Sequence, residues 1–206
     1  MEFKHTYQDF VCKLASDAPV PGGGGASALV GALGVALGTM AANISLKRKQ
    51  TTKILKIKER AEALQNQLLN LIEADAVAFL PLSSAYKLPT STKEQKQHKE
   101  KAMEESLRTA SKVPLLIMRG CCEAILLHEE LEAFMPALLQ SDIGVGVVLC
   151  KAALQGAALN VFCNTKLMQD TEFADRINEE ASNLLKQNIH KADALFERVN
   201  SKLARD

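Results

Sequence analysis

Apolar residues recur along this chain at the three- and four-residue spacing of helices almost throughout, and no stretch shows a convincing strand alternation. The spacing predicts six helices. They cover residues 7–14, about 26–48, about 51–85, 93 to between 128 and 134, 143–165, and about 171–203. Residues suited to N-caps precede several of them: Thr6, Thr92 with Gln95 as a capping box, Ser141 or Asp142, and Asp170 or Thr171.

Two of the predicted helices, 26–48 and 143–165, are nearly free of charge and rich in glycine and alanine. Small residues on one helix face allow another backbone to approach closely, so we expect these two helices to pack together at the centre. The prolines at 81 and 114 are expected to kink or end the helices that contain them. The prediction is an all-α fold, a bundle of long antiparallel helices that forms one domain over residues 1–206.

Composition supports this fold and excludes some partners. The hydrophobic fraction is 47% and aromatic residues make up only 4%, which favours closely packed helices over a β-sandwich. A net charge of +1 argues against nucleic acid as a partner, because binding to phosphates needs clustered basic surface. The five cysteines and four histidines show no metal-ligand spacing, so no metal is predicted.

The same residues bear on location. The uncharged segment 18–46 is long enough to span a membrane, but its glycine run and its alanine-rich helix suit a soluble bundle better, so no membrane is predicted. Residues 1–5 lack a hydrophobic signal region. Unpaired cysteines inside apolar helices indicate a reducing compartment, and we expect a cytoplasmic protein.

The run Gly22-Gly23-Gly24-Gly25 follows two prolines and precedes a long apolar helix. Four glycines are entropically expensive, so they indicate a loop at which the backbone approaches something closely. A helix that begins after such a loop offers free N–H groups and the positive end of its dipole. We therefore expect a cradle for a carboxylate, a phosphate or a polar heterocycle.

A few polar residues interrupt the apolar helices. Asn43, Asn160 and Asn164 must find hydrogen-bond partners if they are buried, either on another helix or on a ligand. Lys151 either extends to solvent or meets an anion. Asp75 lies between small apolar residues; facing inward it would have a raised pKa and suit acid–base chemistry, and facing outward it would be an ordinary helical aspartate. Spacing alone favours an N-cap over a site residue for Asp142.

Several segments together resemble the cyclodeaminase/cyclohydrolase family, which includes the C-terminal domain of formiminotransferase-cyclodeaminase and methenyltetrahydrofolate cyclohydrolases. The similar segments, in the family's order, are residues 19–34, 40–43, 75–79, 87–89, 113–115, 141–146 and 153–161 with Asn164. They cover nearly the whole chain, which makes the resemblance specific. Residues 94–101 and 121–135 depart from the family's pattern.

The resemblance implies an all-helical homodimer that binds a tetrahydrofolate derivative and acts at its N5 and N10 atoms. Cyclodeamination joins N10 to the formimino carbon and releases ammonia, which forms 5,10-methenyltetrahydrofolate. Cyclohydrolysis adds water to the methenyl bridge and forms 10-formyltetrahydrofolate. We expect the cyclodeaminase reaction; the alternatives are cyclohydrolysis, or a non-catalytic folate-binding or helical assembly module.

The resemblance also makes Asp75 and Asp142 catalytic candidates, in preference to an ordinary helical aspartate and an N-cap. The folate-binding residues that it implies are Gly22, Gly23, Gly24, Gly25, Ser27, Asn43, Lys47 and Asn160. Among these, Lys47 is expected to meet the glutamate tail of the folate. The site is thus expected to combine the glycine loop, Asp75 and Asp142.

Overall fold

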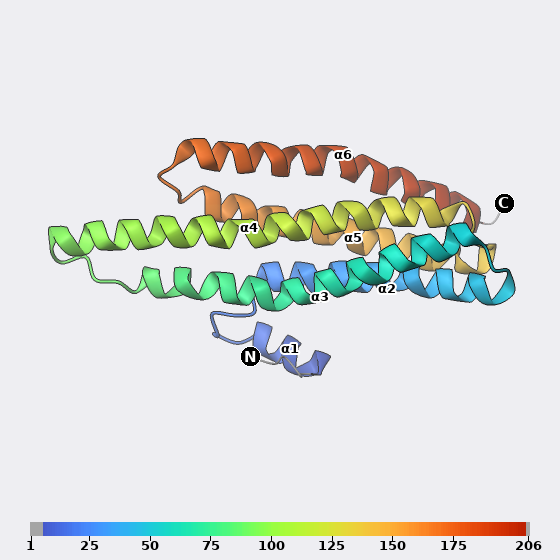
Figure 1. The fold of residues 1–206 in the computed structure, drawn as a ribbon, viewed down its shortest axis with the longest axis horizontal. Coiled ribbons are helices and arrows are strands. Elements are labelled where there is room, and N and C mark those ends of the chain that lie inside the picture. The colour runs from blue at the N-terminus through green and yellow to red at the C-terminus, as the bar shows by residue number, and fades with distance from the viewer. Residues whose placement is uncertain (1–5, 205–206) are drawn as a thin grey trace.

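The computed structural model describes residues 6–204 and shows a helical bundle (Figure 1). The helices are α1 (Tyr7–Leu14), α2 (Gly23–Arg48), α3 (Thr52–Tyr86), α4 (Lys93–Glu132), α5 (Ala137–Thr165) and α6 (Thr171–Leu203). No strand occurs within this range, so the all-α prediction is confirmed. Residues 1–5, on which the absence of a secretory signal was predicted, lie outside the described part of the chain.

The five long helices run antiparallel to their neighbours in sequence (Figure 1). Helices α2, α3, α4 and α5 form a four-helix bundle that closes where α2 packs on α5, and α6 packs on α4 and α5. The predicted pairing of the two small-residue helices, α2 and α5, is confirmed. Helix α4 is equally central because it contacts α2, α3, α5 and α6. Helix α1 stands apart from the bundle and buries none of its residues.

Three helix starts follow the predicted caps. Thr6 and Thr92 each form a capping box with the residue three positions later. The Asp170 carboxylate accepts a hydrogen bond from the N–H of Phe173 at 3.0 Å and caps α6. In each case a side-chain oxygen satisfies an N–H group that the first turn leaves unpaired.

Two other starts differ from the prediction. Helix α2 begins at Gly23, so the glycines predicted to form a loop are its first turn. Helix α5 begins at Ala137 after Pro136, five residues before Asp142, which is therefore not an N-cap. The earlier start buries Leu139 and Gln140. The Gln140 amide donates to the carbonyl of Glu132, the last residue of α4, at 3.1 Å and to that of Met135 in the following turn at 2.9 Å. This packing outweighs the cap signal of Ser141 and Asp142.

The two prolines do not end their helices. Helix α3 continues past Pro81 to Tyr86, and α4 runs through Pro114 without a break. The cysteines are all free; Cys121, Cys122 and Cys150 are buried as expected, whereas Cys12 and Cys163 are exposed. Lys151, which was expected either to extend to solvent or to meet an anion, forms an ion pair with Asp193 of α6.

Helices α2, α3 and α5 are long and apolar enough to cross a membrane, judged by length and composition alone. The sequence drew attention only to the region of α2, and α3 and α5 are additions to it. Half of the most apolar 18-residue stretch of α2 is buried in the bundle. The corresponding shares are 44% for α5 and 33% for α3. A large share of this apolar surface therefore serves helix packing.

Candidate functional site

The first turn of α2 is the centre of the candidate site. Gly22 occupies the N-cap position and supplies no side chain to the turn. The cap comes instead from α3, because the Asp75 carboxylate accepts a hydrogen bond from the N–H of Gly25 at 2.9 Å. A residue 50 positions away thus satisfies an N–H group that an N-cap side chain would normally bind.

Asp75 is the half-buried acid of this site. Burial raises the pKa of its carboxyl group above the ordinary value, and the hydrogen bond from Gly25 partly opposes that rise. The positive end of the α2 dipole lies beside the same carboxylate and also favours the anion. Asp75 therefore faces inward, which is one of the two orientations that the sequence allowed. It holds a proton more readily than an exposed aspartate does.

The approach of Asp75 explains why a glycine stands at position 24. A Cβ atom on Gly24 would lie 2.1 Å from one Asp75 carboxylate oxygen and 2.5 Å from the other. By contrast, a Cβ on Gly25 would meet nothing closer than the Pro21 side chain at 3.6 Å, and one on Gly22 would meet nothing within 4 Å. The closest approach to the glycine run is thus made at Gly24 by the Asp75 carboxylate.

Helix α5 supplies the other side of the site. The Asn160 side chain lies against Gly23, where a Cβ would be 3.1 Å from its amide nitrogen. That nitrogen donates to the carbonyl of Gly156 at 2.9 Å, which fixes the amide plane. The Ser27 hydroxyl donates to the carbonyl of Gly23 at 2.8 Å and packs over Gly156. Gly156 was not among the predicted site residues, and its place in a small-residue run beside Asn160 is the signal that could have found it.

This arrangement suits proton transfer next to an electron-rich or cationic centre. Asp75 can hold or release a proton, and its anion can stabilise a positive charge beside it. Gly23 is exposed and opens the helix end to solvent, and its N–H group has no hydrogen-bond partner among residues 6–204. The turn can therefore bind a polar ligand while Asp75 acts on it.

The remaining predicted residues lie at the other end of the bundle. Lys47 is 24 positions after Gly23 on α2, about 36 Å along the helix axis, and Asn43 is one turn nearer. Asp142 precedes Asn160 by 18 positions on the antiparallel α5, about 27 Å along its axis. Asn43 and Lys47 are exposed and Asp142 is half-buried, so Asn43 is not a buried asparagine that needs a protein or ligand partner. Within one chain these residues do not meet Asp75.

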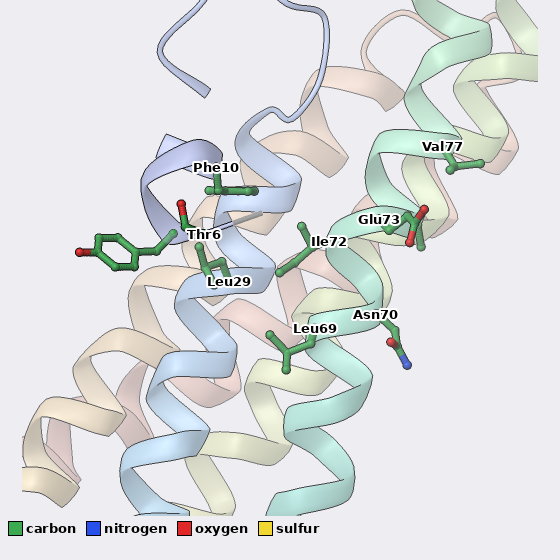
Figure 2. Close-up of a pocket in the computed structure, with 10 residues that line it drawn as sticks. Thr6, Phe10, Leu29, Leu69, Asn70, Ile72, Glu73 and Val77 are labelled. Atoms are coloured by element: carbon green, nitrogen blue, oxygen red, sulfur yellow. The ribbon is translucent and has the colours of Figure 1, made fainter. Parts of the chain in front are cut away.

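A cavity lies next to this site, but Asp75 does not line it. It has a volume of about 660 Å³ and separates α1 from α2 and α3. Figure 2 shows Phe10 of α1, Leu29 of α2 and Ile72 of α3 around it.

The third asparagine of the apolar helices, Asn164, donates to the carbonyl of Ala110 at 3.0 Å. It therefore links α5 to α4, which is the first of the two roles that the sequence allowed. In the described part of the chain no group of three or more His, Cys, Asp and Glu residues could hold a metal.

Comparisons with known proteins give this geometry a family. The family model described as formiminotransferase-cyclodeaminase matches residues 6–183. A methenyltetrahydrofolate cyclohydrolase of Methylorubrum extorquens is 36% identical, over 98% of this chain and 100% of its own length. A solved formiminotetrahydrofolate cyclodeaminase from Thermotoga maritima is 28% identical, covers 97% of this chain and 96% of its own, and has a TM-score of 0.77.

Longer proteins are also similar. The formimidoyltransferase-cyclodeaminase of Rattus norvegicus is 31% identical over 86% of this chain. The match spans only 34% of that protein, so it concerns about a third of its length. The order of the similar segments, the shared helical fold and the match over most of the chain agree. The chain belongs to the formiminotransferase-cyclodeaminase family.

Proposed function

We propose that this protein is an enzyme that hydrolyses 5,10-methenyltetrahydrofolate to 10-formyltetrahydrofolate. The observation that carries the proposal is the Asp75 carboxylate, half-buried with a raised pKa and held 2.9 Å from the N–H of Gly25 at an open helix end. The 36% identical relative that matches along its full length is named as a methenyltetrahydrofolate cyclohydrolase. That match moves the proposed reaction from the cyclodeamination expected from the sequence to cyclohydrolysis.

Asp75 supplies the proton transfers in the proposed reaction. Its anion stabilises the cationic methenyl bridge and takes a proton from the attacking water, whose oxygen bonds to the bridging carbon. The bond between that carbon and N5 then breaks, and Asp75 returns the proton to N5. The hydroxyl proton is released as the formyl carbonyl forms on N10.

Cyclodeamination is the second candidate, and the structural likeness to the Thermotoga maritima cyclodeaminase favours it. There N10 attacks the formimino carbon on N5, and the nitrogen that leaves as ammonia needs a proton. Asp75 can supply it, because a carboxyl group with a raised pKa is a better proton donor near neutral pH. The same residue therefore serves either reaction.

We also propose that the protein is a homodimer joined through α2 and α5. These helices leave an uncovered apolar strip, whose most exposed members are Leu33 and Met40 of α2 and Leu138, Val145, Val148 and Leu159 of α5. Exposed apolar residues that gather on one face are typical of contact surfaces. A second copy, related by a two-fold axis and laid antiparallel, would cover the strip with the same strip.

Such a dimer would also account for the separation of the predicted site residues. A two-fold antiparallel arrangement brings the Lys47 end of one α2 towards the Gly23 end of the other. Asp142 and Asn43 of the second subunit would then approach Asp75 of the first. We propose that the complete site is shared between two subunits in this way.

Two substrates distinguish the candidate reactions. Purified protein is given 5,10-methenyltetrahydrofolate and, separately, 5-formiminotetrahydrofolate, and the methenyl absorbance is followed against buffer alone. Faster loss of absorbance from the first supports cyclohydrolysis. Its appearance from the second supports cyclodeamination. Folate binding without turnover of either would support a binding module and contradict both proposed reactions.

A further inference from the structure

A second cavity, of about 420 Å³, lies between the α3–α4 hairpin and the turn that joins α5 to α6. Its walls combine apolar and cationic groups: Tyr86, Met103 and Leu167 on one hand, Lys96 and Lys99 on the other. Glu100 also lines it and leaves a net charge of +1 among these three charged groups. None of the roles described so far uses this cavity.

The two lysines differ in how they are held. The Lys99 ammonium donates to the carbonyls of Tyr86 at 2.7 Å and Leu88 at 3.1 Å, so it caps the end of α3 and is fixed in the cavity wall. Lys96 forms no hydrogen bond or ion pair with any described residue. An unpaired ammonium next to a fixed one is suited to an anionic group that enters the cavity.

The cavity is aligned with the Asp75 site. Tyr86 follows Asp75 by 11 positions, which places both on one face of α3 about 16 Å apart along its axis. On α5, Cys163 lies one turn beyond Asn160 and is close enough to Tyr86 that, with burial, it raises the pKa of the Tyr86 phenol. Asp75 with Asn160 and Tyr86 with Leu167 thus define a line along α3 and α5, which we call the α3–α5 path.

We infer that this cavity binds the carboxylates of the glutamate tail of the folate, with Lys96 as the residue that pairs with them. This inference rests on the proposed function and adds a tail subsite to it. With the pterin at Asp75, the aminobenzoyl ring would follow the α3–α5 path over Tyr86, and the tail would reach Lys96. The alternative residue is Lys47, to which the resemblance assigned the tail. Within one chain it lies about 36 Å along α2 from Gly23, whereas in the proposed dimer the Lys47 end of the second subunit would approach Gly23.

The test compares two unreactive probes by titration calorimetry: 5-formyltetrahydrofolate, and 5-formyltetrahydropteroate, which lacks the glutamate. Wild-type protein should bind the first more tightly, and the advantage should shrink as salt is added. Lys96→Ala should weaken binding of the folate by up to about fivefold, the upper end for an exposed ion pair, and leave pteroate binding unchanged. Lys101→Ala is the matched control, since this lysine is on the same helix and is exposed outside the cavity.

Each outcome decides something. Loss of the glutamate advantage in Lys96→Ala, but not in Lys101→Ala, supports the inference. An advantage that survives Lys96→Ala, or that disappears in Lys47→Ala, overturns it. Equal binding of both probes by wild-type protein also overturns it and leaves the proposed reaction standing, whereas failure to bind either probe contradicts the proposed function as well.

Discussion

At the scale of single residues, Asp75 has two roles that can be separated. It caps α2 by accepting the Gly25 N–H, and it carries the proton in the proposed reaction. An asparagine keeps a side-chain oxygen that can accept this hydrogen bond but cannot transfer a proton. An alanine removes both functions, so the pair Asp75→Asn and Asp75→Ala distinguishes a helix cap from a catalytic acid.

The raised pKa of Asp75 predicts a pH dependence of stability. The folded state holds this proton more tightly than the unfolded state, so Asp75 lowers the free energy of unfolding as pH rises from its unfolded pKa, near 3.8, through its raised folded pKa. Asp75→Asn should remove that loss. Urea titrations of both proteins at several pH values measure the difference. A difference that does not change with pH across this window would contradict the burial of Asp75.

The contacts of Gly24 predict a sharp difference between neighbouring glycines. A Cβ at position 24 would collide with the Asp75 carboxylate, whereas one at position 25 would make ordinary contact with Pro21. Gly24→Ala should therefore move the carboxylate and reduce kcat at least tenfold, while the fold survives because the side chain can rotate away. Gly25→Ala should retain activity, because it keeps the N–H group. Equal activity of the two variants would contradict this geometry.

The sequence could not decide the orientation of single side chains. The pattern around Asp75 fitted an inward or an outward position equally well, and only the resemblance favoured the inward one. Asn43 lies in an apolar helix like Asn160, yet Asn43 is exposed and Asn160 is half-buried. Which face of a helix is covered depends on its neighbours, and a single chain's spacing does not specify them.

At the scale of helices, ends with a side-chain cap were predictable and ends set by tertiary packing were not. Thr6, Thr92 and Asp170 cap their own helices, so the signal lies within three residues. The start of α2 depends on Asp75, which is remote in sequence, and the start of α5 depends on contacts between Gln140 and the end of α4. Local sequence carries neither of these interactions.

The packing of α4 against α2 and α5 gives a prediction about His128. This buried imidazole bonds through Nδ1 to the carbonyl of Ala124 at 2.8 Å, and its Nε2 lies 2.2 Å from where a Cβ on Gly146 would be. Gly146→Ala should therefore destabilise the protein by about 1–3 kcal/mol, although alanine is the better helix former by about 1 kcal/mol.

A double-mutant cycle tests the cause. His128→Ala opens the space that the new methyl group needs, so the double variant should be more stable than the sum of the two single effects predicts. Chemical denaturation of the four proteins measures the coupling. Additive effects would show that Gly146 does not make room for His128.

At the scale of the whole molecule, the uncovered strip on α2 and α5 predicts the oligomeric state. Light scattering after size exclusion should give a dimer for the wild-type protein. Val145→Glu places a charge in the strip and should yield a monomer with lower activity, because the second subunit is proposed to complete the site. Leu126→Glu on α4 is the control, as this residue is partly exposed outside the strip.

Two results would contradict the proposed dimer. A wild-type monomer with full turnover would contradict the shared site, and detergent-dependent solubility would indicate that the strip contacts lipid instead of a second copy.

The overall architecture was the most predictable level, because helical spacing and the two small-residue helices define a bundle. The distribution of the candidate site along it was not predictable. Gly23 and Lys47 lie in one helix, and a helix of that length separates them by about 36 Å. Both were predicted site residues because the family resemblance identifies residues but gives no distances between them. Only the structure of the bundle shows that Asp75 contacts the glycines and that Asp142 does not.

The most direct test of the central claim, that Asp75 at the glycine turn performs folate one-carbon chemistry, is the turnover rate of Asp75→Asn beside wild-type protein. The loss of 5,10-methenyltetrahydrofolate absorbance is measured above the buffer rate, with thermal melting recorded for both proteins. We predict that wild-type protein accelerates the reaction and that Asp75→Asn loses roughly 10²- to 10⁴-fold of that rate without a lower melting temperature. An unchanged rate in Asp75→Asn would contradict the claim.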